Sequence, residues 1–210
     1  MNKFYFLVII IQTLFNLSFA DELKSIFPEN GKSICDHGNK LPKLTKGERE
    51  KTKSMLMKKC LKDDAVACLT LGMLYIFDEK KEKKGISFFQ KSCQLGEKEG
   101  CFHFALKLSK LNPIKSQMLL SSNCQLGHIK SCRRVAENFN RQKNREKAQY
   151  FYQLSCEKND LKSCYKLAML EPNLDKRINL LKNNCENRHL LSCRASDVLH
   201  QKFNAISGDR

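Results

Sequence analysis

Apolar residues recur along the chain at spacings that predict a series of short helices. Two large apolar residues stand five and four positions before a cysteine in five segments: Met55 with Leu56, Phe88 with Phe89, Leu119 with Leu120, Phe151 with Tyr152, and Leu180 with Leu181. With the cysteine they form a stripe at i, i+1 and i+5, which fits one face of an α-helix. A second helix is predicted after a second cysteine, where an apolar residue precedes a small one: Leu71 with Gly72, Phe104 with Ala105, Val135 with Ala136, and Leu167 with Ala168.

The seven residues that separate the two cysteines have the composition of a tight turn. Gly96 and Gly127 stand three positions after the first cysteine of their segments, and Asp63 and Asn159 occupy the same place in two others. These residue types accept the left-handed conformation that ends a helix. A serine precedes the second cysteine in three segments, where we expect its hydroxyl to cap the second helix: Ser131, Ser163 and Ser192.

Helix boundary signals divide the chain into five such helix pairs. Thr45 with Glu48 forms a capping-box pattern, Asn112 before Pro113 opens another helix, and Pro172 ends one. The predicted repeat units are residues 45–81, 82–112, 113–142, 143–173 and 174–201, after a loop-rich segment 21–44 and before a polar tail 202–210. A single helix pair cannot bury its apolar face alone, so the pairs are expected to stack into an all-α solenoid.

Residues 1–20 have the pattern of a secretory signal peptide. Lys3 supplies the positive charge, an apolar run follows, and Ser18 and Ala20 form a small-x-small cleavage site before Asp21. An uncleaved anchor helix is the alternative, but the apolar run is interrupted and shorter than the roughly 20 residues that a membrane span needs. We therefore expect a mature chain that begins near Asp21, has no transmembrane segment and is secreted or periplasmic.

Ten of the eleven cysteines form Cys-x7-Cys pairs, one for each helix pair: Cys60 and Cys68, Cys93 and Cys101, Cys124 and Cys132, Cys156 and Cys164, and Cys185 and Cys193. An exported protein keeps disulfides, so these pairs are predicted to be disulfide bonds across the turns. Zinc is the competing interpretation, but structural zinc sites use Cys-x2–4-Cys spacings, which the chain lacks. We expect no metal and no other cofactor.

These segments resemble a known family of repeats. The segment from Phe89 to Cys101 and the segment from Cys164 to Ala168 look like Sel-one-like repeats, and the exported Cys-x7-Cys form resembles the Helicobacter cysteine-rich protein family. The resemblance implies a right-handed α-solenoid of about five disulfide-stapled antiparallel helix pairs, related to tetratricopeptide repeats. The units here are shorter than the family's, and the glycine between units is retained only at Gly85, so the family's binding surface does not transfer residue by residue.

The same resemblance implies a possible enzyme, because family members are described as binding or hydrolysing β-lactams. Serine β-lactamases use Ser-x-x-Lys together with Ser-Asp-Asn and Lys-Thr-Gly. Ser163 and Lys166 have the first spacing, but neither partner motif accompanies them. Helix capping explains Ser163 more simply, so the catalytic residues stay unassigned.

The remaining cysteine and the histidines do not form a recognisable catalytic or metal-binding motif in the sequence. Cys35 is the odd cysteine, and with His37 it suggests a Cys–His nucleophile, a bridge to another chain, or a thiol buried against the first repeat; we expect it to be unpaired within the chain. The five histidines show no metal-ligand spacing: His37, His103, His128, His189 and His200. His128 and His189 fall in the turns and are expected to be solvated.

Positive charge is the strongest functional signal. The formal net charge is +16, and basic clusters at residues 80–84 and 141–147 lie at unit boundaries. Such a field favours anionic partners, although a merely soluble basic surface would look the same. Export from the cytosol argues against nucleic acid as a partner. The sequence thus predicts an exported binding scaffold for a protein, a peptide or an anionic envelope component; the alternative is a β-lactamase with a β-lactam or muropeptide-like ligand.

Overall fold

A computed structural model describes residues 45–77 and 79–207 of the chain. The chain divides into two units, residues 1–52 and 53–210, and only residues 45–52 of the first unit are described. The predictions for the signal peptide, for the segment 21–44 and for Cys35 with His37 lie outside the described residues. The side chains of the tail 202–210 lie outside them as well.

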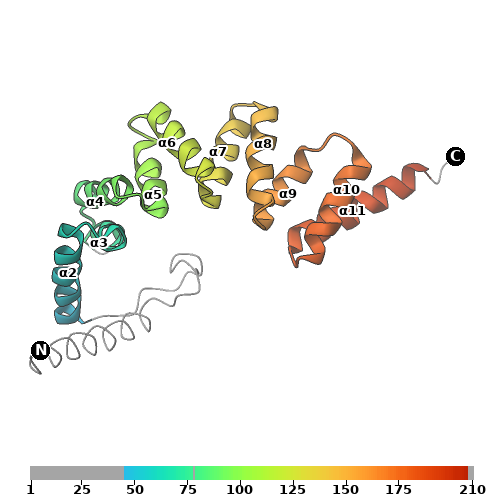
Figure 1. The fold of residues 1–210 in the computed structure, drawn as a ribbon. Coiled ribbons are helices and arrows are strands. Elements are labelled where there is room, and N and C mark those ends of the chain that lie inside the picture. Colours follow the sequence, from blue (N-terminus) through green and yellow to red (C-terminus); the bar gives the residue numbers. More distant parts are fainter. Residues whose placement is uncertain (1–44, 78, 208–210) are drawn as a thin grey trace, which may run out of the picture. The chain divides into compact units, whose positions relative to one another are not determined.

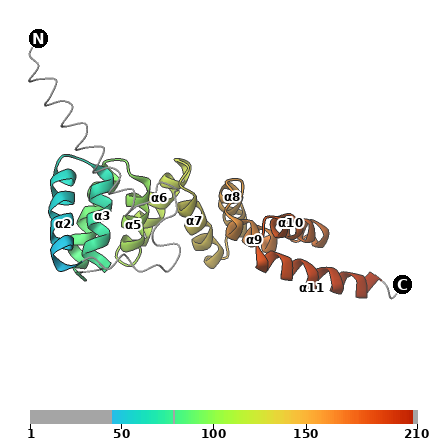
Figure 2. The same ribbon diagram turned by 90° about the horizontal axis from the view of Figure 1, so that it is seen from below.

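All regular structure in the described ranges is α-helical. The helices are α2 (Lys46–Leu61), α3 (Ala65–Phe77), α4 (Glu82–Gln94), α5 (Lys98–Leu108), α6 (Pro113–Gln125), α7 (Ile129–Arg141), α8 (Arg145–Cys156), α9 (Leu161–Leu170), α10 (Leu174–Glu186) and α11 (Leu190–Ser207). Within residues 53–210, each helix from α3 to α10 packs against the helix that follows it, and Figures 1 and 2 show this succession of helix hairpins. The expected all-α solenoid of helix pairs is confirmed.

The predicted helix starts are present. Thr45 and Glu48 form the capping box: the Thr45 amide donates to Glu48 Oε2 at 2.8 Å, and the Glu48 amide donates to Thr45 Oγ1 at 3.3 Å. Asn112 caps α6 by accepting a hydrogen bond from the Lys115 amide at 2.9 Å, with Pro113 at the first helical position. Each cap satisfies an amide that has no partner within its helix.

The turn inside each hairpin uses one left-handed residue at the same place. Gly96 and Gly127 have φ of 88° and 87°, and Asp63 and Asn159 both have φ of 62°. The sequence pattern missed Arg188, which takes the same position in the fifth hairpin with φ of 65°. An arginine carries a steric cost there that glycine avoids.

The core follows the two predicted stripes. The residue four positions before the first cysteine is buried in every hairpin: Leu56, Phe89, Leu120, Tyr152 and Leu181. The small residue after the second cysteine allows close approach of neighbouring backbones, as expected. A Cβ atom added at Gly72 would lie 2.4 Å from the Phe89 ring, and one added at Gly85 would lie 2.8 Å from the Gly72 carbonyl oxygen.

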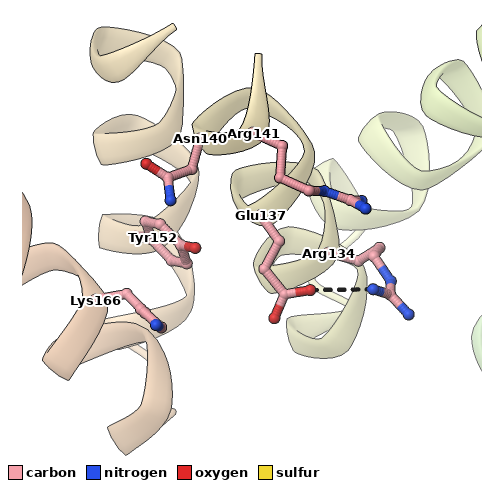
Figure 3. Close-up of a pocket in the computed structure, with 6 residues that line it drawn as sticks. All are labelled: Arg134, Glu137, Asn140, Arg141, Tyr152 and Lys166. Carbon is pink, nitrogen blue, oxygen red and sulfur yellow. Dashed lines mark hydrogen bonds and ion pairs between the residues drawn. The ribbon is translucent and has the colours of Figure 1, made fainter. Parts of the chain in front are cut away.

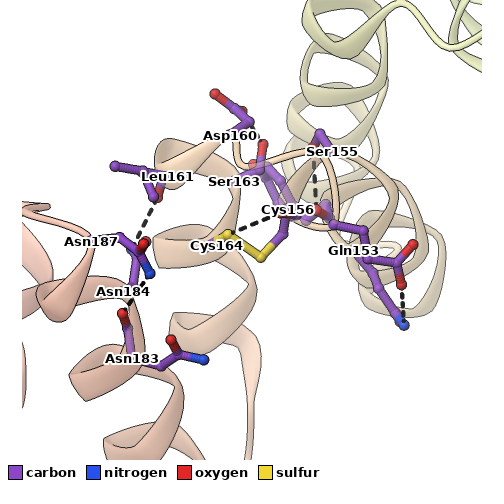
Figure 4. Close-up of a disulfide and its surroundings, with 12 residues drawn as sticks. Gln153, Ser155, Cys156, Asp160, Leu161, Ser163, Cys164, Asn183, Asn184 and Asn187 are labelled. Carbon is purple, nitrogen blue, oxygen red and sulfur yellow. Dashed lines mark hydrogen bonds between the residues drawn. A yellow bond between two sulfur atoms is a disulfide. The ribbon is translucent and has the colours of Figure 1, made fainter.

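Each of the five cysteine pairs is bonded across its own hairpin turn. The Cα–Cα distances lie between 4.3 and 4.8 Å, within the usual range for a disulfide or just below it. Figure 4 shows one of them, Cys156–Cys164, at the turn between α8 and α9. The Cys60–Cys68 and Cys124–Cys132 bonds are buried, whereas the other three are half-buried. Five such bonds are typical of a protein that resides in an oxidising compartment.

Candidate binding site

The residue directly before the second helix of each hairpin lies four positions before the second cysteine, and in three hairpins its side chain caps that helix. It is acidic in three hairpins and histidine in two: Asp64, Glu97, His128, Asp160 and His189. The Asp64 side chain accepts from the Ala67 amide at 2.9 Å, and the His128 ring accepts from the Ser131 amide at 3.3 Å. The expectation that serines cap these helices is therefore wrong. The expectation of solvated turn histidines is wrong as well, because His128 and His189 are half-buried.

The three serines instead lie one turn inside the helix and are buried completely. Ser131 Oγ contacts His128 Nδ1 at 2.8 Å, and Ser163 Oγ donates to Asp160 Oδ2 at 2.5 Å. Side chains in a helix point back toward its N-terminus, which brings a serine at this position to the cap residue. The serine hydroxyl thus orients the side chain of the residue before the helix and does not itself cap the helix.

A buried polar residue before the first cysteine links successive hairpins. Ser92 donates to the Ala65 carbonyl at 2.9 Å, and Asn123 donates to the Lys98 carbonyl at 2.8 Å. Asn184 donates to the Leu161 carbonyl at 3.0 Å, as Figure 4 shows. Each accepting carbonyl belongs to the residue three positions before the second cysteine of the preceding hairpin. These bonds satisfy carbonyls at the hairpin junctions and fix the register of one hairpin on the next.

Glu99 forms the centre of a cluster of ionisable groups. Its carboxylate accepts from His128 Nε2 at 2.9 Å, from Lys130 Nζ at 3.0 Å and from His103 Nε2 at 3.3 Å. Because His128 Nδ1 accepts from the Ser131 amide, the ring proton resides on Nε2 and is donated to Glu99. Burial raises the pKa of Glu99, but the bonds from His103, His128 and Lys130 outweigh it, so the pKa lies well below its ordinary value.

Ser131, His128 and Glu99 have the residue types of a hydrolase triad but not its accessibility. Ser131 is 0% exposed, and its hydroxyl also accepts from Asn123 Nδ2 at 2.8 Å. A nucleophile must reach its substrate, and this hydroxyl lies under the helix junction. Ser163 is equally buried, and so is Ser155, which has the same Ser-x-x-Lys spacing to Lys158. None of these serines can attack a β-lactam in this structure.

An open hollow lies between α7, α8 and α9, with a volume of about 310 Å³. Arg134, Glu137, Asn140 and Arg141 of α7 line one side, Lys166 of α9 lines the other, and Tyr152 of α8 forms the floor, as Figure 3 shows. The guanidinium of Arg133 pairs with Asp160 at 2.6 Å, which holds the start of α9 against α7. The walls of the hollow are therefore fixed relative to one another.

The hollow carries a surplus of positive charge. Its one carboxylate, Glu137, is paired with Arg134 at 3.2 Å. Within the described residues, Arg141 and Lys166 form no ion pair; Arg141 donates to Asn138, and the Lys166 ammonium lies 5.8 Å from the Tyr165 ring centre. Burial, with the charge of Glu137, raises the pKa of Tyr152 to about 12, so its hydroxyl is a neutral hydrogen-bond donor at pH 7.

The helix-hairpin arrangement matches two solved structures. A protective antigen of uropathogenic Escherichia coli with an SLR fold aligns with 71% of this chain and 36% of its own length, at 17% identity and a TM-score of 0.63. A Sel1 repeat protein from Oxalobacter formigenes aligns with 70% of this chain and 68% of its own, at 12% identity and a TM-score of 0.60. The chain has the Sel1-like repeat fold. No family model matches the sequence, and no curated protein matches it.

Within the Sel1-like repeats, Arg134 and Lys166 occupy equivalent positions, two residues after the second cysteine. The other hairpins carry uncharged or weakly basic residues there: Thr70, His103 and Ala195. The basic hollow is therefore a local feature of the third and fourth hairpins rather than a repeating surface. Sequence reasoning missed it, although aligning the hairpins on their cysteines would have set these two cations side by side.

Two further properties of the described ranges bear on the sequence predictions. No three histidine, cysteine or acidic side chains gather there in a way that could hold a metal ion. Among the helices described, none is both long enough and apolar enough to cross a lipid bilayer.

Proposed function

We propose that the protein is an exported interaction scaffold that binds an acidic segment of a partner protein or peptide in the hollow between α7 and α9. The observation that carries the proposal is that Arg134, Arg141 and Lys166 line one hollow whose single carboxylate, Glu137, is already paired. Arginine binds carboxylates with two parallel hydrogen bonds, and lysine adds a further charged donor. Repeat solenoids present extended surfaces to such ligands.

The periplasm or the extracellular space is the proposed location. The signal pattern of residues 1–20 and the five disulfides support it together, since a reducing cytosol does not maintain such bonds. Acidic segments of other exported proteins are then the partners that the hollow would meet.

Binding of a fluorescent hexaglutamate peptide to the purified, oxidised protein tests the proposal. Arg134→Gln with Lys166→Gln should weaken binding about tenfold or more, because two charge-assisted hydrogen bonds to carboxylate are lost. The matched control, Lys58→Gln with Arg194→Gln, removes the same charge from two exposed positions elsewhere and should have little effect. Equal weakening by both variants, or no preference over hexaglutamine, would show that the hollow is not the site.

β-Lactam hydrolysis is the alternative function, and it has only the family resemblance to support it. Turnover of a chromogenic cephalosporin by the oxidised protein measures it directly. We expect none, because Ser155 and Ser163 are fully buried. Turnover that persists through purification and disappears in a Ser163→Ala variant would reverse this ranking.

A further inference from the structure

A protruding apolar stripe begins at the connection between α5 and α6. Leu111 is 79% exposed, Ile114 is 74% exposed and Met118 is 68% exposed. Ile114 and Met118 are four residues apart and share one face at the start of α6, and Leu111 lies just before the N-cap of this helix. All residues from 109 to 115 are exposed, so nothing in the described structure covers these side chains.

The backbone that carries the stripe is firmly held. The amides of Leu111 and Asn112 both donate to the Leu108 carbonyl, at 2.9 and 2.7 Å. Pro113 has no amide hydrogen, and the Lys115 amide donates to the Asn112 side chain. Ser116 Oγ anchors the first turn of α6 by donating to the buried Ala105 carbonyl at 2.7 Å. Satisfied backbone groups matter because entry into an apolar medium is costly for amides without partners.

The charges around the stripe are positive. Lys110 and Lys115 flank Leu111 and Ile114, and residues 109–118 contain no acidic side chain. The neighbouring carboxylate, Glu82, is already paired with Lys107 at 2.9 Å. Protruding apolar side chains between lysines suit a surface with an apolar interior and an anionic boundary.

The connections between other hairpins also carry exposed apolar residues, basic residues or both. Helices that alternate in direction place all connections between hairpins at the same helix ends. Phe77 is 60% exposed near the cluster 80–84, which has four lysines and Glu82, and the connection from α7 to α8 has exposed basic residues at 141, 143, 145 and 147 beside Glu146. A flat anionic surface can meet several of these connections at once, whereas a groove-seeking peptide helix would engage one.

We propose that the connections between hairpins, led by Leu111 and Ile114, form a docking surface for anionic lipid bilayers. The apolar side chains enter the interfacial region while Lys110 and Lys115 contact lipid phosphates. Arg141 belongs both to the hollow between α7 and α9 and to the α7–α8 connection, but Leu111, Ile114, Lys110 and Lys115 do not line the hollow, so neither proposal depends on the other.

Co-sedimentation with lipid vesicles tests the docking surface. The oxidised protein should bind vesicles of equal parts phosphatidylglycerol and phosphatidylcholine at least about tenfold more strongly than pure phosphatidylcholine vesicles. Leu111→Ser with Ile114→Ser should reduce binding to the anionic vesicles about tenfold. Lys110→Gln with Lys115→Gln should also weaken it and make the remainder less sensitive to salt. These residues are exposed, so circular dichroism should show unchanged folding.

A matched control lies at the other end of the same helix. Leu126, the C-cap of α6, is 64% exposed but lies roughly 20 Å from Pro113 along the helix axis. Leu126→Ser should leave vesicle binding unchanged, and so should the Arg134→Gln, Lys166→Gln variant of the hollow. Equal binding to neutral vesicles, or equal weakening by Leu126→Ser, would overturn the proposal. Undiminished vesicle binding by Leu111→Ser with Ile114→Ser would also overturn the proposal and would indicate that the stripe binds a protein partner instead.

Discussion

The third and fifth hairpins contain the same polar trio in different surroundings. Asn123, His128 and Ser131 of the third hairpin correspond to Asn184, His189 and Ser192 of the fifth. The asparagine amide donates to the serine at 2.8 Å in one and 2.6 Å in the other, and the histidine Nδ1 lies 2.8 Å from the serine hydroxyl in both. An aromatic ring of the preceding hairpin packs on each histidine, at 5.4 and 5.6 Å between ring centres.

The preceding hairpin makes the difference. Two residues before its second cysteine it supplies Glu99 to His128, whereas it supplies Lys162 at the equivalent position before His189. The histidine of the third hairpin therefore belongs to an ion network, whereas the histidine of the fifth hairpin meets a lysine at the position where a carboxylate would complete one. Two hairpins that share these internal residues can therefore be held to their neighbours with unequal strength. The strength depends on a residue of the neighbouring hairpin, which the repeat pattern does not specify.

Of the changes considered, removing a disulfide should lower the free energy of unfolding most. The chain-entropy model gives roughly 2.5 kcal/mol for each nine-residue loop. Cys124→Ser with Cys132→Ser should cost more than Cys185→Ser with Cys193→Ser, because the central pair is 3% and 4% exposed and two buried hydroxyls would replace it. Urea unfolding followed by circular dichroism at 222 nm measures both.

Native-state reduction checks the same difference without substitution. Mild reductant followed by alkylation and mass spectrometry should label Cys185 and Cys193 before Cys124 and Cys132, since access governs thiol exchange. Equal unfolding free energies for the two double variants, together with simultaneous labelling, would show that the two hairpins are equally stable.

Removing the carboxylate of the third-hairpin network should have a smaller effect. Glu99→Gln is expected to lower the free energy of unfolding by about 1–2 kcal/mol at pH 7, since charge-assisted hydrogen bonds are lost. The pKa of Glu99 is lowered in the folded protein, so its contribution is present above the unfolded pKa of about 4.3 and is lost as the pH falls further. Unfolding measured from pH 7 to pH 3 should therefore show a weaker acid dependence in the variant. A Lys162→Gln variant serves as control and should keep the wild-type acid dependence.

Supplying the missing carboxylate to the fifth hairpin should have the smallest effect. Lys162→Glu is expected to raise the free energy of unfolding by about 0.5 kcal/mol, the usual size for a partly exposed ion pair. The gain should vanish in a His189→Gln background, which a double-mutant cycle measures. A gain that persists without His189 would mean that the removal of positive charge, not a new pair, stabilises the protein.

The helices and turns could be predicted from sequence because their determinants are local. The apolar stripes, Gly96 and Gly127, and the capping box at Thr45 all act within a few residues, and the structure confirms them. Arg188 escaped prediction because its residue type gives no sign of a left-handed backbone. The capping serines were misassigned because a serine at the first turn and a serine at the cap look alike until the half-buried histidines are placed.

The hollow and the Glu99 network could not be predicted because each joins separate hairpins. Tyr152 is a core residue by its stripe position, and only the packing of α7 against α8 and α9 surrounds it with Arg134 and Lys166. Glu99 reads as a surface residue of a helix start; His103 of the same helix is one partner, but only the neighbouring hairpin supplies His128 and Lys130. The predictions for the signal peptide and for Cys35 stay predictions, because they fall on residues outside the described ranges.

The cysteine spacing also sets the order in which the protein can fold. Every bridge joins residues eight apart in sequence, so no bridge waits for a distant part of the chain. Short loops close fastest and with the least loss of entropy, which favours each native partner over the cysteines of other hairpins. Each hairpin can therefore oxidise by itself as soon as its own residues are available, and each finished hairpin offers the next a surface on which to fold.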